Sequence, residues 1–170
     1  MNLQEWVPFV SAGAASLAAL LAGINLWLTG KRADISWRRS ALEHAFVDFL
    51  TAHYDHWDAC NGVIRSHSGL SGHSSEADLV STAREADTTM MRCVTRFRVL
   101  ASPQMAKTAL ALRRFNDDDL DAIESGSVKA LIEGGHVETL MATREAIDRE
   151  REQARDTFVG QARQVLRISH

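Results

Sequence analysis

Apolar residues dominate the start of the chain, where the run from Trp6 to Gly30 contains no charged side chain. As a helix, Val7 to Leu28 would extend over roughly 33 Å, close to the hydrocarbon thickness of a bilayer. A buried soluble helix is less favoured, since a chain of 170 residues has too small a core to cover it on every side. The pattern therefore predicts a single transmembrane helix over residues 7–29, preceded by a short extracytoplasmic tail, residues 1–6.

Four basic residues follow this run, and none precedes it: Lys31, Arg32, Arg38 and Arg39. Because Lys and Arg are enriched on the cytoplasmic side of membrane spans, we expect residues 30–170 to be cytoplasmic and the tail to lie outside. This juxtamembrane basic cluster is also expected to attract anionic membrane lipid. A cleaved signal peptide is disfavoured, because the chain opens MNLQEW without a positive side chain.

Small residues recur every fourth position within the predicted transmembrane helix, at Ser11, Ala15, Ala19 and Gly23. Such a face lets two membrane helices approach closely, so it is a possible association face for a homo-oligomer. Ala and Gly are common in membrane helices generally, and a chance match is the alternative.

After the basic cluster, apolar residues recur at spacings of three and four, the period of amphipathic helices. The predicted helices cover about 35–67, 79–100, 103–124 and 136–168. The turn signals between them are SGLSGHSS, then Ser102-Pro103, and finally a connector between Ser125 and Gly135 with room for one helical turn. Long helices with short connections predict an all-α fold with an antiparallel three- or four-helix bundle.

Charged stretches interrupt the apolar stripes of the last two long helices. We interpret the acidic run from Asp117 to Asp121 as a helix break, capped by Asn116 or Asp117, with a solvated acidic face. The stretch from Asp148 to Asp156 predicts that the last helix projects past its neighbours or pairs with another chain.

The composition restricts the function further. A net charge of −3 with mixed signs gives no reason to expect nucleic acid as a partner. The two cysteines, Cys60 and Cys93, fit buried thiols in a reducing compartment.

His53, His56 and Cys60 share one helix face and are possible zinc ligands, but they lie on the apolar stripe. Buried core histidines are therefore the preferred interpretation. Glu133 and His136 form a single Glu-x-x-His pair within a connector, whereas di-iron bundles need two pairs on helices. The acidic run lacks the Gly and Glu of a calcium-binding EF-hand. No phosphate loop or nucleophile motif is present.

These observations predict no catalytic residue, metal or cofactor. The architecture resembles that of small bacterial single-pass membrane proteins, a resemblance that transfers no residue. We expect a non-enzymatic, membrane-anchored protein whose cytoplasmic bundle binds an unidentified protein or a second copy at the inner membrane face. The alternatives are a membrane-permeabilising or channel-like homo-oligomer and, less favoured, a metal-dependent enzyme using His53, His56 and Cys60.

Overall fold

The computed structural model describes the backbone of residues 7–68 and 75–167 and the side chains of residues 21–68 and 75–166. Within these ranges it contains five helices and no strand, which confirms the all-α prediction. The helices are α1 (Val7–His67), α2 (Glu76–Leu100), α3 (Pro103–Glu124), α4 (Ser127–Glu133) and α5 (Val137–Arg167).

The chain divides into two compact units, residues 1–40 and residues 41–170. In the first unit, every described side chain from Leu21 to Arg38 is exposed. Among the described residues, no helix combines the length and the apolar character needed to cross a membrane. The side chains of residues 7–20, which belong to the predicted transmembrane helix, lie outside the described part of the chain. The transmembrane helix therefore stays a prediction.

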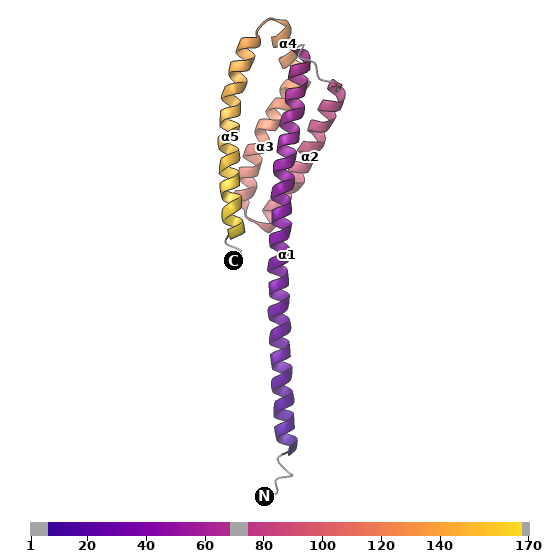
Figure 1. The fold of residues 1–170 in the computed structure, drawn as a ribbon, viewed down its shortest axis with the longest axis vertical. Coiled ribbons are helices and arrows are strands. Elements are labelled where there is room, and N and C mark those ends of the chain that lie inside the picture. The colour runs from indigo at the N-terminus through magenta and orange to yellow at the C-terminus, as the bar shows by residue number, and fades with distance from the viewer. Residues whose placement is uncertain (1–6, 69–74, 168–170) are drawn as a thin grey trace. The chain divides into compact units, whose positions relative to one another are not determined.

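The second unit is an antiparallel bundle of four long helices (Figure 1). Residues 41–67 of α1, followed by α2, α3 and α5, run alternately up and down, and α4 connects α3 to α5 at one end. Helix α3 packs against both α2 and α5. Ring contacts join α1 to α2 and α5, since Phe46 stacks on Phe97 of α2 and Phe49 packs against Phe158 of α5.

The helix boundaries follow from local capping chemistry. Ser75 accepts a hydrogen bond from the backbone N–H of Asp78 and caps α2. Ser102 accepts one from the N–H of Met105 and caps α3, with Pro103 in the first turn. Each serine supplies an acceptor for an N–H that has no partner within the helix. The Ser102 cap lies where the sequence predicts a helix start, whereas α2 begins three residues before the predicted position 79.

Two glycines set the ends of the connector around α4. Gly126 has φ of 73° and precedes α4, and Gly135 has φ of 77° and follows it. These left-handed backbone angles are readily adopted by glycine, which has no Cβ to clash with the following carbonyl oxygen. The connector between Ser125 and Gly135 contains a helix, as predicted, but α4 has seven residues, or about two turns, where one turn was expected.

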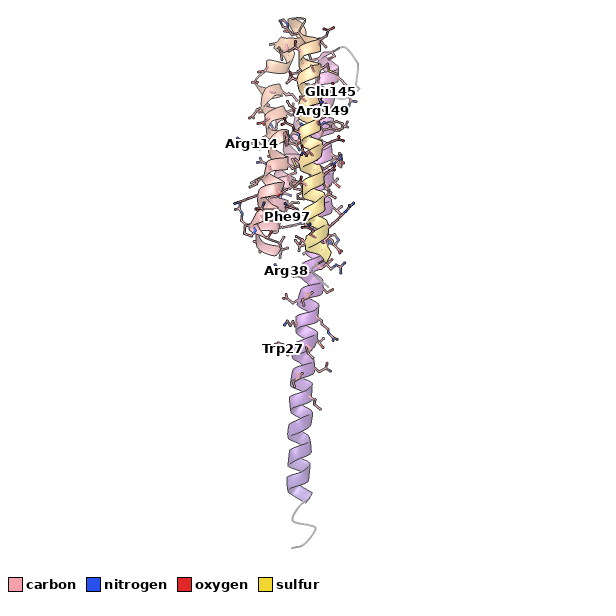
Figure 2. All side chains as sticks on the ribbon, turned by 90° about the vertical axis from the view of Figure 1, so that its left-hand side faces the viewer. Trp27, Arg38, Phe97, Arg114, Glu145 and Arg149 are labelled. Carbon is pink, nitrogen blue, oxygen red and sulfur yellow. The ribbon has the colours of Figure 1, made fainter. Side chains whose placement is uncertain are left out.

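The apolar core confirms most of the predicted stripes. Phe46, Phe49, Phe97 and Phe158 pack together with ring centroids 4.8–5.8 Å apart. Phe97, marked in Figure 2, is 0% exposed. At the start of α5 the apolar spacing places Val137, Leu140 and Met141 inward, and this prediction is wrong in part. Leu140 is buried, but the exposed fraction is 39% for Val137 and 58% for Met141, because these two side chains lie outside the buried face.

Candidate functional site

A layer of buried polar side chains crosses the bundle between two apolar clusters. One cluster includes the four packed phenylalanines, and the other includes Cys60, Val63 and Ile123. Between them along the helices lie the residues that we call the polar layer: His53 and His56 of α1, Asn116 and Asp119 of α3, and Arg151 of α5. Each of these five side chains is at most 7% exposed.

Asp119 is the main acceptor of the polar layer. Its Oδ2 accepts a hydrogen bond from Arg151 Nη2 at 2.5 Å, and its Oδ1 lies 3.5 Å from Arg144 Nη1. Arg144 also donates to Asn61 Oδ1 of α1 at 2.8 Å, and Arg151 donates to Asp148 Oδ1 at 2.6 Å. The two arginines of α5 therefore join α5 to α1 and α3.

These ion pairs correct both interpretations of the charged stretches. Helix α3 runs without a break from Pro103 to Glu124, so Asn116 is buried within it and does not cap a helix start. Asp119 is also buried, whereas Asp118 and Asp121 are exposed, so only part of the run forms the predicted solvated face. The stretch from Asp148 to Asp156 does not project past the bundle, because Arg151 is buried and pairs with Asp119. Buried charges are tolerated here because each is paired and hydrogen-bonded.

A second ion pair lies beside the layer and joins α2 to α3. Arg113 Nε and Nη2 donate to the two carboxylate oxygens of Asp87 at 2.6 and 2.9 Å. Its Nη1 lies 3.0 Å from Asp117 Oδ2. Arg113 and Asp87 are about one fifth exposed, so this two-point geometry is well screened from water and fixes the register of the two helices.

The predicted burial of His53 and His56 is confirmed. Burial, followed by the charge of Arg151, lowers the pKa of His53 from 6.5 to about 4, and burial also lowers the pKa of His56. His53 is therefore neutral at pH 7. Two nitrogens of the pair, His53 Nδ1 and His56 Nε2, have no hydrogen-bond partner, and neither do Asn116 Oδ1 and Arg151 Nε.

The thiols do not have the character of nucleophiles. Cys60 and Cys93 are free and buried, as predicted. Burial raises the pKa of Cys60 to about 12 and that of Cys93 to about 11, so both stay protonated at neutral pH. His56 Nδ1 lies 3.6 Å from Cys60 Sγ. Among the described residues, no group of three or more His, Cys, Asp or Glu side chains is arranged to hold a metal ion.

A pocket of about 140 Å³ opens beside the polar layer, between α1 and α5. Its lining residues are His53, Tyr54 and Trp57 of α1 and Asp148, Arg151, Glu152 and Arg155 of α5. Two hydrogen bonds connect its walls: Trp57 Nε1 donates to Asp148 at 3.4 Å, and Arg155 Nη1 donates to the Tyr54 hydroxyl at 3.1 Å.

The residues predicted as sites in the N-terminal unit are only partly described. The side chains of Ser11, Ala15 and Ala19 lie outside the described part of the chain. Gly23 is exposed, and a methyl group at its Cα would meet no atom within 4 Å.

The basic cluster is described throughout. Lys31, Arg32 and Arg38 are exposed, and Arg39 is partly exposed. The Lys31 ammonium lies 5.2 Å from the centre of the Trp27 ring, and Figure 2 marks Trp27 and Arg38 on this part of α1.

The sequence contains a signal for the polar layer, but it is missed when only apolar residues are counted as inward-facing. In α3 the apolar stripe of Met105, Ala109 and Leu112 continues at the same alternating spacing through Asn116 and Asp119 to Ile123. In α5 the same spacing leads from Leu140 through Arg144, Ile147 and Arg151 to Ala154 and Phe158. The phase of the stripe therefore places these polar residues inward.

No protein-family model, no curated protein and no solved structure shows significant similarity to this chain.

Proposed function

We propose that this protein is a membrane-anchored interaction protein, in which the N-terminal helix holds a helical bundle at the inner membrane face to bind another protein. The observation that carries the proposal is the apolar character of the start of α1. The run from Trp6 to Gly30 contains no charge, and its described large apolar side chains, Leu21, Ile24, Leu26, Trp27 and Leu28, are 39–75% exposed. A helix that is apolar all round needs apolar surroundings, and a bilayer supplies them.

The basic cluster supports the orientation of this anchor. Lys31 and Arg32 follow the apolar run directly, and Trp27 lies just before them, at the level where indole rings prefer the membrane interface. Headgroup phosphates would attract the exposed Lys31 and Arg32 side chains. In this orientation, residues 41–170 lie on the cytoplasmic side.

The bundle itself supports an interaction role. The buried ion pair of Asp119 and the partly buried ion pair of Asp87 join three of its helices and would keep the surface of the bundle rigid. Val137 and Met141 lie four residues apart on α5, and both are exposed, so they offer apolar area to a partner. The described thiols and the histidines of the polar layer are buried, and this favours a binding role over a catalytic one.

A membrane extraction experiment tests the anchor. The full chain is expected to stay in the membrane fraction after an alkaline carbonate wash. Replacing Leu17 and Leu21 by Arg places two charges near the middle of the apolar run, at a cost of about 2.5–3.5 kcal/mol each near the bilayer centre, and should release much of the protein. Leu131→Arg on the exposed surface of α4 is the matched control and should leave the protein in the membrane. Wild-type protein that washes off completely would overturn the anchor.

Crosslinking in native membranes tests the interaction. A photoreactive residue at Met141 should capture a specific cytoplasmic protein, whereas the same residue at Glu150, which is exposed further along α5, should not. Capture of only other copies of the chain would contradict the proposal that the bundle binds a different protein and would favour a homo-oligomer.

A further inference from the structure

The pocket between α1 and α5 has the size of one small molecule with a ring. A volume of about 140 Å³ is close to that of engineered cavities that take up benzene, about 150 Å³. Trp57 and Tyr54 contribute aromatic surface to its wall. His53, only 2% exposed, forms its inner side, while Tyr54 is 47% exposed and lies toward solvent. A ligand would therefore pack its apolar part along the aromatic wall.

The two cationic residues of the pocket, Arg151 and Arg155, lie close enough to its inner wall to affect His53. After burial, which is the largest cause, the charges of Arg151 and Arg155 also lower the pKa of His53, so both guanidinium groups act on the buried imidazole. Arg151 is 5% exposed, and its Nε–H has no acceptor. His53 Nδ1 also lacks a partner. The inner part of the pocket therefore contains positive charge and buried polar atoms with unused hydrogen-bonding capacity.

The carboxylates of the pocket leave Arg155 available to a ligand. Asp148 is already bound by Arg151 and by the Trp57 indole N–H. Arg155 lies 3.7 Å from Glu152 and 3.2 Å from Asp156, whose side chains are 68% and 74% exposed. Water screens these exposed pairs strongly, so they are weak. A carboxylate held against the aromatic wall would be screened less and would compete well for the Arg155 guanidinium.

We propose that this pocket binds a small carboxylate whose apolar part is about the size of one aromatic ring. The Arg155 guanidinium pairs with the carboxylate, and the ring packs against Trp57 and Tyr54. Binding fills the pocket between α1 and α5 without a covalent step. The proposal is independent of the membrane anchor, because all the residues that it uses lie within residues 41–170.

Calorimetric titration of the full chain in mild detergent tests this proposal with benzoate as the probe. Benzoate should bind saturably, and its affinity should fall as salt is added. Acetate, which has no ring, and benzylamine, which carries the opposite charge, should each bind at least about tenfold more weakly. Binding of benzylamine as tight as that of benzoate, or no saturable binding of benzoate, would overturn the proposal.

Variants locate the site. Arg155→Gln should weaken benzoate binding about tenfold or more, because it removes a charge-assisted hydrogen bond. Arg149→Gln is the matched control, since Arg149 is exposed on the same helix and does not line the pocket (Figure 2). Equal losses in the two variants would also overturn the proposal. If Arg155→Gln does not fold, the comparison of benzoate, acetate and benzylamine on the unchanged chain still tests the proposal.

Discussion

The carboxylate of Asp119 accepts hydrogen bonds from Arg151 and Arg144 inside the bundle. Asp119 is 7% exposed, whereas its neighbour in sequence, Asp118, is exposed. The two residues are chemically identical, and only their positions around α3 differ. A comparison between them therefore isolates the contribution of burial and pairing.

We expect Asp119→Ala to lower the free energy of unfolding by about 3–5 kcal/mol, because it leaves Arg151 as a buried charge with one partner fewer. Asp118→Ala should change it by no more than about 0.5 kcal/mol. Urea denaturation followed by circular dichroism measures both. Similar losses in the two variants would show that the polar layer contributes little to stability. The double variant Asp119→Leu with Arg151→Met, which removes both charges, should recover part of the loss.

His53 gives the bundle a dependence on pH. Its pKa is about 4 in the folded chain, against an ordinary value of 6.5, because burial and the charges of Arg151, His56 and Arg155 oppose protonation, and only the neighbouring Asn116 side chain acts in the other direction. The unfolded chain therefore binds more protons between these values. The contribution of the neutral His53 to the free energy of unfolding is therefore fully present above pH 6.5 and is lost as the pH falls toward 4.

From pH 7 to pH 5 the contribution of His53 should lower the free energy of unfolding by about 2 kcal/mol. Urea denaturation at both pH values measures the change. His53→Leu should reduce the loss, since it removes the titrating group, whereas His136→Gln, an exposed position, should keep it. A loss of the same size in His53→Leu would assign the pH dependence to other groups.

At the scale of the elements, helix starts depend on residues within one turn. Ser102 caps α3, and the cap was predictable because serine followed by proline is a local signal. The predicted break in the same helix was wrong for the opposite reason. The run of aspartates from Asp117 to Asp119 has a low helix propensity. It is nevertheless stabilised within α3 by the i,i+4 pair of Arg113 with Asp117 and by the tertiary pair of Arg151 with Asp119.

We expect Ser102→Ala to lower the free energy of unfolding by about 1 kcal/mol, because the N–H of Met105 loses its acceptor. Thermal or urea denaturation measures the loss. Ser81→Ala, at an exposed position inside α2, should be neutral or slightly stabilising, since alanine has the higher helix propensity. A destabilisation of Ser81→Ala equal to that of Ser102→Ala would contradict the capping role.

At the scale of the whole molecule, residues 41–170 contain both apolar clusters and the polar layer between them. We therefore expect a fragment of these residues to be helical and monodisperse without detergent and to melt cooperatively. Circular dichroism and gel filtration check this outcome. An aggregated or non-cooperative product would show that the bundle depends on residues 1–40.

Phe97→Ala in the same fragment provides a test of the core. Phe97 is 0% exposed and contacts three other phenylalanine rings, so its loss should cost about 3–5 kcal/mol, measured by urea denaturation. Val99→Ala, at a side chain 73% exposed on the same helix, should cost less than about 0.5 kcal/mol.

The sequence was sufficient for the all-α class, the approximate helix boundaries and most of the apolar core. Apolar periodicity and capping act over one or two turns, so both can be recognised in a single stretch of chain. The same periodicity places Asp119 and Arg151 on inward faces, but it does not show which charges pair. Asp119 and Arg151 are separated by 32 positions, and only the packing of α3 against α5 brings their charges together. A buried charge is stable only with its partner, and the tertiary structure supplies that partner.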